Sequence, residues 1–356
     1  MTAGGFDPEA HWGARLTLGE LPAAAARRFG DREALAFRGR RYSFREIDAE
    51  VDRLARGLIA VGVEPGEKVC IWLTNCPEWI FAMFALARVG AVHVPVNTRF
   101  RIEDLGYVLR QSEATTLLTH DVSGPIDYLA MAREVRPRRL VLRSERRHAG
   151  AMAWADCLAA GDAVDRAALR ARAAAVRPTD TTLIMYTSGT TGFPKGVMRD
   201  HALVRSTVDR LRRLRTTEAD VIINYLPLFH IFGYIDGPMS TMLGGHRQVL
   251  TETFDPDETL DLVAREGGTQ LHGFETHVNA LADAQAARPR DLRTLRTGIF
   301  AMGMASAGPI GRRARTVLAP LRHVTAYGIT EVGANVSMSD IDATEEQSCE
   351  TSGYPC

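Results

Sequence analysis

The chain contains a run of small and hydroxylated residues that could bind a phosphate group. Residues 187–192 read Thr-Ser-Gly-Thr-Thr-Gly, and Lys195 follows after Phe and Pro. Glycine reaches positive φ and leaves backbone N–H groups open to an anion, while hydroxyls add donors and the lysine adds charge. Apolar residues 183–185 precede the run, and a helical pattern begins at Asp200. The sequence therefore predicts a strand, a Gly-rich phosphate loop and a helix in that order.

A second segment carries one histidine among apolar neighbours and reads Asn224-Tyr-Leu-Pro-Leu-Phe-His-Ile-Phe-Gly233. We expect a strand to run into a proline turn that presents His230. Imidazole can donate or accept a proton near neutral pH. Taken alone, such a histidine is more often a core residue satisfied by backbone groups, so its role depends on the surrounding motif.

A third segment, Ala326-Tyr-Gly-Ile-Thr-Glu331, is expected at the end of a strand. The glycine would let the aromatic, hydroxyl and carboxylate side chains gather around one point. The alternative interpretation is a surface turn with an incidental glutamate.

The three segments, in this order, resemble the signature motifs of the adenylate-forming superfamily, which includes acyl-CoA synthetases, luciferase-like enzymes and peptide-synthetase adenylation domains. The first run is not a Walker-type loop, because Phe193-Pro-Lys-Gly196 follows the last glycine. The segments GDREAL, NCPEW, GAVHVPVN and EDLGYVLRQSEA resemble the amino-terminal subdomain of the same family.

This resemblance implies roles for individual residues. Tyr327 and Gly328 would lie at the adenine, with Gly303 in a second adenine loop, and Thr330 at the α-phosphate. Glu331 would bind Mg²⁺, and a carboxylate suits that hard cation. His230 would lie by the acyl carboxylate and shape the entry of a thiol. The phosphates would contact Thr187, Ser188, Gly189, Thr190, Thr191, Gly192 and Lys195.

The implied reaction activates a carboxylic acid with ATP and Mg²⁺ and passes the acyl group to coenzyme A. The expected catalytic residues are His230, Lys195, Thr330 and Glu331. No covalent nucleophile is required, and no Gly-x-Ser-x-Gly turn surrounds Ser188. A carrier-protein phosphopantetheine remains an alternative acceptor.

The expected acyl pocket favours a fatty, alicyclic or aryl acid. Amino-acid-activating relatives carry an Asp beside the histidine, whereas this chain has Ile231 and Phe232. His272 and Glu275 either recognise a polar acyl group or form a solvated strand end, and both interpretations stay open. The candidate pocket residues are His230, Phe232, Tyr234, His272, Phe274 and Met302.

Strand and helix patterns alternate along the chain, which predicts an α/β fold with mostly parallel sheets. Strands are expected at 34–37, 68–73, 91–96, 115–119, 139–142, 221–225, 269–272, 297–301 and 323–326. Helices are expected at 18–29, 44–62, 77–88, 103–111, 164–175, 200–215, 256–266, 276–287 and 309–318. We expect two stacked α/β subdomains, residues 1–178 and 179–356.

Composition narrows the class of protein. The 356 residues are 46% hydrophobic with a formal net charge of zero, so nothing electrostatic favours nucleic acid as a partner. The five cysteines show no metal spacing, and no signal peptide or transmembrane segment is expected, so we predict a cytoplasmic protein.

The sequence ends at Glu350-Thr-Ser-Gly-Tyr-Pro-Cys356, which resembles the point where the family's β-barrel subdomain begins. We therefore expect the barrel and the small carboxy-terminal domain to be missing, and an isolated chain with little activity. The alternative is a naturally short binding protein that acts with a partner. A homodimer is a further open alternative.

Overall fold

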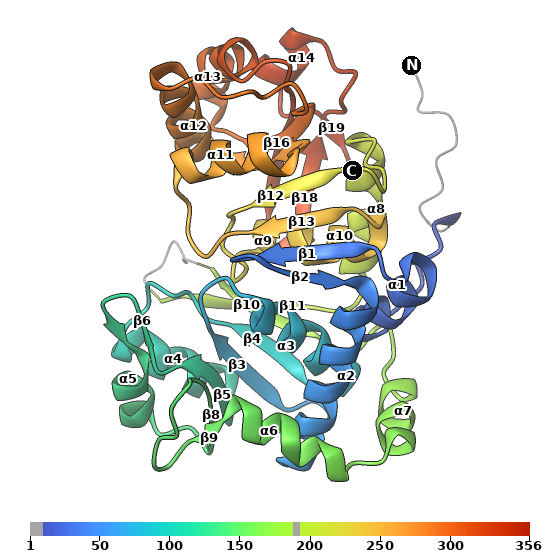
Figure 1. Ribbon diagram of the computed structural model, residues 1–356, viewed down its shortest axis with the longest axis vertical. Coiled ribbons are helices and arrows are strands. Elements are labelled where there is room, and N and C mark those ends of the chain that lie inside the picture. Colours follow the sequence, from blue (N-terminus) through green and yellow to red (C-terminus); the bar gives the residue numbers. More distant parts are fainter. Residues whose placement is uncertain (1–9, 188–192) are drawn as a thin grey trace.

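Two mostly parallel β-sheets organise the computed structural model, which describes residues 10–187 and 193–356. The sheets and their helices form two layers stacked along the long axis of the molecule (Figure 1). Among the described residues, no helix combines the length and the apolar character needed to cross a bilayer. The α/β fold with mostly parallel sheets, predicted from the alternation of strands and helices, is confirmed.

The first sheet has seven strands, and its interior strands are short and almost entirely buried, as expected for parallel strands covered on both faces. In spatial order the strands are β11 (Lys195–Arg199), β10 (Leu183–Thr187), β4 (Val92–Pro95), β3 (Lys68–Trp72), β5 (Thr116–His120), β8 (Arg139–Arg143) and β9 (Met152–Ala153). The helices of this layer are α2 (Phe44–Ala60), α3 (Pro77–Arg88), α4 (Ile102–Ser112), α5 (Tyr128–Val135), α6 (Trp154–Ala160) and α7 (Arg166–Ala174).

The second sheet is larger and holds the carboxy-terminal half of the chain. Its strands run β19 (Tyr354–Pro355), β18 (Ala334–Met338), β17 (Arg322–Ile329), β16 (Thr297–Ala301), β14 (Gln270–Leu271), β12 (Val221–Asn224), β13 (Arg247–Leu250), β1 (Glu33–Phe37) and β2 (Arg40–Ser43), with β15 (Gly273–Phe274) on β16. Its helices are α1 (Leu21–Phe29), α8 (Leu203–Arg213), α9 (Ile231–Tyr234), α10 (Ser240–Gly244), α11 (Pro256–Glu266), α12 (Glu275–Ala287), α13 (Met304–Val317) and α14 (Glu345–Glu350).

The sheets do not follow the division at residue 178 that we expected. β1, near the amino terminus, pairs in parallel with β13 of the second sheet, with Leu35 opposite Gln248. β10, which follows residue 178, pairs in parallel with β4 of the first sheet, with Leu183 opposite His93. In Figure 1 the blue β1–β2 hairpin accordingly lies next to β13. Each layer therefore contains strands from both sides of the expected boundary.

One of the hydrophobic clusters spans both layers. Trp79 on α3 contacts the ring of Tyr234 on α9 at a centroid distance of 5.8 Å, and both side chains are fully buried. Asn75, also buried, bridges the layers through its amide. Its Nδ2 donates to the carbonyl oxygens of Leu226 and Thr251 at 3.0 and 3.1 Å, and its Oδ1 accepts from the backbone N–H of Leu228 at 3.0 Å. These contacts fix the strand ends of one layer against those of the other.

Candidate active site

The Gly-rich run lies in a β-hairpin. Thr187, the last residue of β10, pairs with Lys195, the first residue of antiparallel β11, and residues 188–192 between the strands lie outside the described residues. The predicted order of strand, loop and helix is therefore wrong, because β11 intervenes and α8 begins only at Leu203. Because β11 follows, no helix N-terminus lies directly after the loop to help bind an anion. Ser188, Gly189, Thr190, Thr191 and Gly192 stay predictions.

Helix α4 holds the base of this hairpin. The hydroxyl of Tyr107 donates to the carbonyl oxygen of Pro194 at 3.0 Å, and its ring stacks on Phe193 at 5.2 Å. The hydroxyl of Tyr186 on β10 donates to Gln111 of α4. These contacts fix both strands where they enter and leave the loop. Lys195 itself is exposed, as an anion-binding lysine must be before its ligand arrives.

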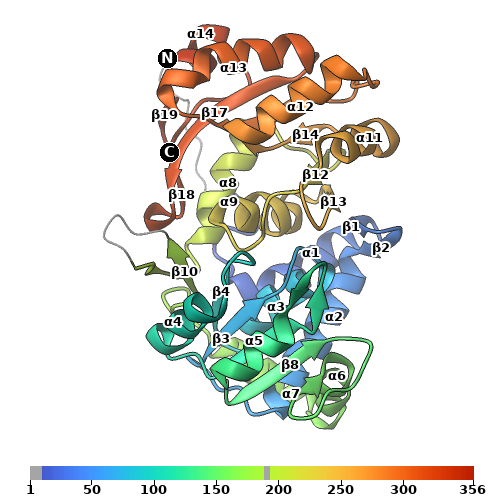
Figure 2. The same cartoon turned by 90° about the vertical axis from the view of Figure 1, so that its left-hand side faces the viewer.

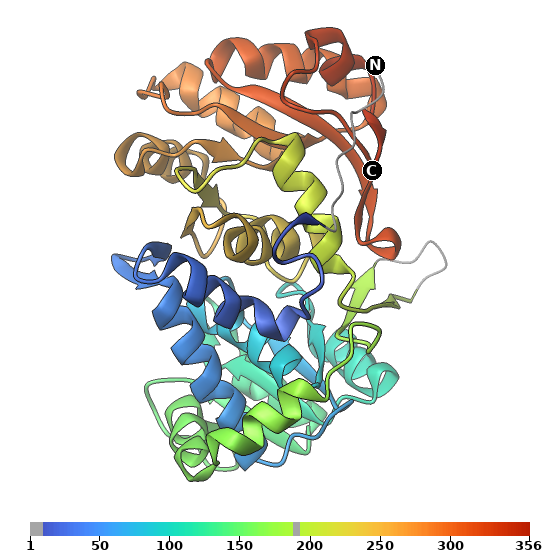
Figure 3. The ribbon, with the colours of Figure 1, turned by 90° about the vertical axis from the view of Figure 1, so that its right-hand side faces the viewer.

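The third motif lies directly beside the hairpin. β17 ends at Ile329 and continues into a 3₁₀ turn, η5 (Thr330–Val332). Arg199, the last residue of β11, donates from Nη1 to the carbonyl oxygen of Glu331 at 2.6 Å. Figures 2 and 3 both show the lower end of the β17–β18 hairpin next to β10 and β11. The structure thus brings together the two motifs to which the sequence assigned phosphate binding.

The residues of this motif differ in their exposure. Tyr327 is 52% exposed, which leaves a ring face open for stacking on a base. Gly328 and Glu331 are also exposed, whereas Thr330 is buried. No group of three or more His, Cys, Asp or Glu residues among the described ones could hold a metal by itself. A single open carboxylate nevertheless fits Mg²⁺, which usually takes one or two carboxylates together with substrate phosphates and waters.

His230 lies at the start of α9, where the sequence predicted a proline turn. Its Nδ1 accepts from the backbone N–H of Phe232 at 3.2 Å, so the ring caps the short helix. Burial lowers the pKa of His230 below 6.5, so the ring is neutral at pH 7. Because Nδ1 is the acceptor, we assign the proton to Nε2, which is then a hydrogen-bond donor.

Two cavities meet at this histidine, and both are lined by His230 and Phe274. The larger one, about 670 Å³, lies between the layers and includes Asn75 and the segment 97–99 of the first layer. The smaller one, about 50 Å³, extends into the second layer and includes Phe232 and Arg210. His230 therefore stands between a wide interlayer cavity and a narrow, mostly apolar pocket.

The other predicted pocket residues lie in different places, some in the wall of the small pocket and others behind it or in the core. Phe232 and Phe274 line the small pocket, with their ring centroids 5.3 Å apart. His272 is buried behind it, where Nδ1 accepts from the backbone N–H of Ile299 at 3.0 Å. Met302 is half-buried and packs against the core of the second layer.

Tyr234 does not reach either cavity and is buried in the core shared by the layers. Its ring contacts Trp79 and His93, because the turn of α9 that exposes Phe232 to the pocket directs Tyr234 toward α3. Gly303 lies at the N-cap of α13, six residues before the expected helix start, and is exposed. Glu275 begins α12 and pairs with Ser306 of α13, so it does not reach the acyl pocket.

Three residues that the structure brings to the site were not predicted from the sequence: Arg199, Arg210 and Asn335. Arg199 is missed because β11 was not predicted. Arg210 did carry a signal, since it follows Leu203 and Thr207 at helical spacing and is therefore a cation on the buried face of α8. Asn335 lies in a strand that the sequence did not predict.

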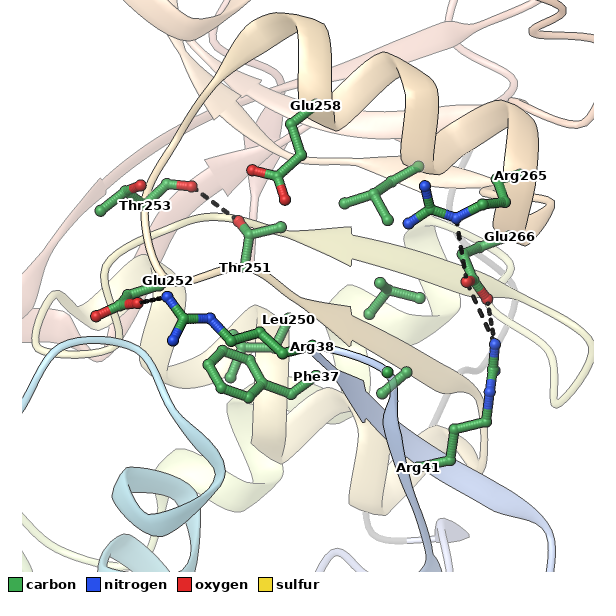
Figure 4. Close-up of a pocket in the computed structure, with 14 residues that line it drawn as sticks. Phe37, Arg38, Arg41, Leu250, Thr251, Glu252, Thr253, Glu258, Arg265 and Glu266 are labelled. Atoms are coloured by element: carbon green, nitrogen blue, oxygen red, sulfur yellow. Dashed lines mark hydrogen bonds and ion pairs between the residues drawn. The ribbon is translucent and has the colours of Figure 1, made fainter. Parts of the chain in front are cut away.

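A further cavity of about 190 Å³ lies between the β1–β2 hairpin and α11, away from these motifs (Figure 4). Most of its charged side chains pair with one another. Arg38 contacts Glu252, and Arg41 contacts Glu266 at 3.0 Å. Because the charges already compensate one another, we do not place the active site there.

Comparison with known sequences decides the family. A sequence profile described as "AMP-binding enzyme" matches residues 22–356. The chain belongs to the AMP-binding enzyme family. This confirms the membership in the adenylate-forming superfamily that the three motifs indicated.

Relatives of this AMP-binding enzyme are named as acyl-CoA ligases or synthetases. Acyl-CoA ligase sidI of Aspergillus fumigatus is 31% identical over 332 residues, which cover 89% of this chain and 56% of the relative. The putative acyl-CoA synthetase YngI of Bacillus subtilis is 29% identical over 95% of this chain and 65% of its own length. The chain thus spans less than two thirds of the length of these relatives.

Solved structures show the same fold. Mycobacterium smegmatis MbtA superposes with a TM-score of 0.83 at 26% identity, covering 96% of this chain and 62% of that one. The anthranilate CoA ligase AuaEII, solved with anthranoyl-AMP, gives a TM-score of 0.83 at 20% identity, covering 98% and 66%. The latter likeness concerns the fold of the AMP-binding enzyme alone.

Proposed function

We propose that this chain carries the acid-activating site of an ATP-dependent acyl-CoA ligase. The observation that carries the proposal is the bond from Arg199 to the carbonyl oxygen of Glu331, which places the phosphate-loop hairpin beside the Tyr327–Glu331 motif. The first reaction would join a carboxylate oxygen to the α-phosphorus of ATP and release pyrophosphate. The second would transfer the acyl group to the sulfur of a thiol and release AMP.

The main barrier to the first step is electrostatic, because a carboxylate must approach a polyanionic nucleotide. Donors fixed in advance at the phosphates lower that barrier, since they need no reorganisation as charge develops. Lys195 at the base of the hairpin would supply a mobile cation, and Thr330 a hydroxyl from a nearly buried position. Mg²⁺, when bound at Glu331, would neutralise phosphate charge.

His230 would position the acid. Its neutral ring offers Nε2–H as a donor to a carboxylate oxygen that enters between the two cavities. A protonated ring would pair with the carboxylate more tightly and oppose its attack, so the burial that keeps the ring neutral favours the reaction. His230 thus orients the attacking carboxylate without neutralising its negative charge.

The two cavities suggest where each substrate lies. The acyl group would occupy the small pocket lined by Phe232 and Phe274, and the thiol would approach through the wide interlayer cavity. Arg99 lines the wide cavity, and a cation there suits the phosphates of coenzyme A. Because His230 and Phe274 line both spaces, an acyl-adenylate formed at one would be within reach of a thiol in the other.

Binding of a stable acyl-adenylate mimic tests the proposal without requiring turnover. A 5′-O-(N-acylsulfamoyl)adenosine replaces the labile phosphate ester and should bind the purified chain, with heat measured by titration calorimetry. Thr330→Val should weaken it by roughly tenfold, because a hydrogen bond to a charged or polarised group is lost. Thr344→Val, at the cap of α14, is the matched control. If no mimic binds at any accessible concentration, the proposal fails.

A further inference from the structure

Arg210 is a buried cation, and one nitrogen of its guanidinium group has no hydrogen-bond partner among the described residues. On α8 the residue is 3% exposed, and its partner Asp236, in the π-helical turn η4 (Ile235–Met239), is 2% exposed. The guanidinium meets this carboxylate edge-on: Nε donates to Oδ1 at 2.8 Å, and Nη2 donates to Oδ2. The third nitrogen, Nη1, is buried and has no hydrogen-bond partner among the described residues.

Arg210 is also part of the wall of the small pocket that we propose for the acyl group. Arg210 lines the small cavity together with His230, Phe232 and Asn335. Its Cζ lies 5.9 Å from the ring centroid of Phe232, so the guanidinium is flanked by an apolar wall of that pocket. The wide interlayer cavity, by contrast, does not include Arg210. A group that enters past His230 therefore meets the arginine inside the narrow pocket.

If the ion pair served only to connect α8 to η4, it would explain the contacts of Nε and Nη2. It would not explain why Nη1 is buried without a partner among the described residues. A buried donor without an acceptor destabilises the protein, and natural interiors rarely retain one. Asp236 contacts the Nε and Nη2 edge of the guanidinium and makes no hydrogen bond with Nη1. A ligand in the small pocket, which Arg210 lines, could supply the missing acceptor.

We propose that the acyl substrate carries a neutral oxygen acceptor that binds Nη1 of Arg210, so that the preferred acids are oxo- or hydroxy-substituted carboxylic acids and not plain alkyl acids. This inference rests on the proposed function, since it assumes that the small pocket receives the acyl group. His230 then holds the carboxylate end of the substrate, and Arg210 holds the acceptor inside the pocket.

Charge balance selects a neutral acceptor over a second carboxylate. The opposite charges of Arg210 and Asp236 cancel, so the pair has no net positive charge that could balance a second carboxylate. A carbonyl or hydroxyl oxygen would satisfy Nη1 without changing that balance. A second carboxylate would leave one net negative charge buried among Phe232, Phe274 and Ile299, which is costly in an apolar pocket.

Matched acylsulfamoyl adenosines test this directly. The probes are the pentanoyl and 4-oxopentanoyl compounds, the hexanoyl and 5-oxohexanoyl compounds, and the succinyl compound, which places a carboxylate where 4-oxopentanoyl has a methyl ketone. Titration calorimetry on the chain should show at least one oxo probe binding about tenfold or more tighter than its alkyl counterpart, as expected for a hydrogen bond from a charged donor. The succinyl probe should bind more weakly than 4-oxopentanoyl.

The variant Arg210→Met/Asp236→Asn removes the donor without leaving a buried charge. It should bind oxo and alkyl probes with equal affinity, while still binding the alkyl probes. The matched control is Arg88→Met/Asp48→Asn, which breaks the ion pair between buried Arg88 on α3 and half-buried Asp48 on α2. Neither residue lines either cavity. It should keep the wild-type preference, and thermal unfolding will show whether both variants are folded.

The outcomes separate the two proposals. If no probe binds the wild-type chain, the adenylate site itself is refuted and the inference fails with it. If all probes bind equally, or if the oxo preference survives in Arg210→Met/Asp236→Asn, the site stands and the role of Arg210 is refuted. Tighter binding of the succinyl probe would overturn the choice of a neutral acceptor.

Discussion

Arg199 and Glu331 are 132 positions apart in the sequence, yet Nη1 of the first lies 2.6 Å from the backbone oxygen of the second. The contact joins the edge strand of the first sheet to the turn that follows β17 of the second. Gly333 permits it, since a Cβ at that position would lie 2.7 Å from Nη2 of Arg199, and its φ of +82° suits glycine. The site is therefore assembled across the two layers.

Loss of this contact should weaken nucleotide binding more than it affects folding. Arg199→Met keeps the length of the side chain but removes the donor to Glu331. We expect ATP affinity to fall roughly fivefold, equivalent to about 1 kcal/mol for one lost hydrogen bond. Titration calorimetry with MgATP measures the effect, and the exposed Arg170→Met on α7 is the control. Unchanged affinity in Arg199→Met would show that the two motifs do not act together.

The role of Glu331 predicts a specific dependence on magnesium. Glu331→Gln removes the charge that would hold Mg²⁺ but keeps the shape of the side chain. ATP should bind this variant almost as well as wild type in EDTA, and most of the gain on adding MgCl₂ should disappear. Glu346→Gln on the exposed face of α14 should retain the full gain. An equal magnesium effect in all three proteins would rule out Glu331 as the ligand.

The amide of Asn75 should be a large contributor to stability. Its three hydrogen bonds are buried and reach the second layer, so Asn75→Ala should lower the free energy of unfolding by about 3 kcal/mol, at roughly 1 kcal/mol for each bond. Urea denaturation followed by circular dichroism gives the value. Asn279→Ala, on the partly exposed surface of α12, should change it by less than about 0.5 kcal/mol. Comparable losses in the two variants would contradict the bridging role.

His93 should make the fold sensitive to acid. Burial lowers its pKa from 6.5 to about 3, and both ring nitrogens lack partners among the described residues. Between pH 6.5 and 3 the unfolded chain binds a proton there that the folded chain does not, so stability falls as the pH falls. Above pH 6.5 both states are neutral at this residue, and the contribution is constant.

Replacing this histidine should therefore flatten the acid side of the stability profile. Each pH unit in that window costs about 1.4 kcal/mol for one proton, so between pH 7 and pH 5 His93→Leu should lose about 2 kcal/mol less than wild type. Urea midpoints at pH 8, 7, 6 and 5 give the comparison, with parallel profiles expected above pH 7. Profiles that stay parallel down to pH 5 would mean that His93 is solvated or protonated in the folded state.

Much of the secondary structure could be predicted because its causes are local. Ser43 and Glu46 form a capping box at the start of α2, and Pro77 opens α3 at its first position. The buried strands near residues 68–72 and 297–301 follow from short apolar runs. β11 was missed because Lys195–Arg199 has no strong strand pattern. It becomes a strand by pairing with β10.

By itself the sequence determined the family and the α/β class, and it predicted Lys195, His230 and Glu331 as site residues, since all of these depend on local residue types and spacing. Only the tertiary structure decided which of them meet. Strand pairing distant in sequence joined β1 to β13 and Arg199 to Glu331. Packing places Phe232 in the pocket wall and Tyr234 in the core. It also leaves Nη1 of Arg210 without a partner among the described residues. Such outcomes depend on which distant surfaces come together, and no local pattern specifies them.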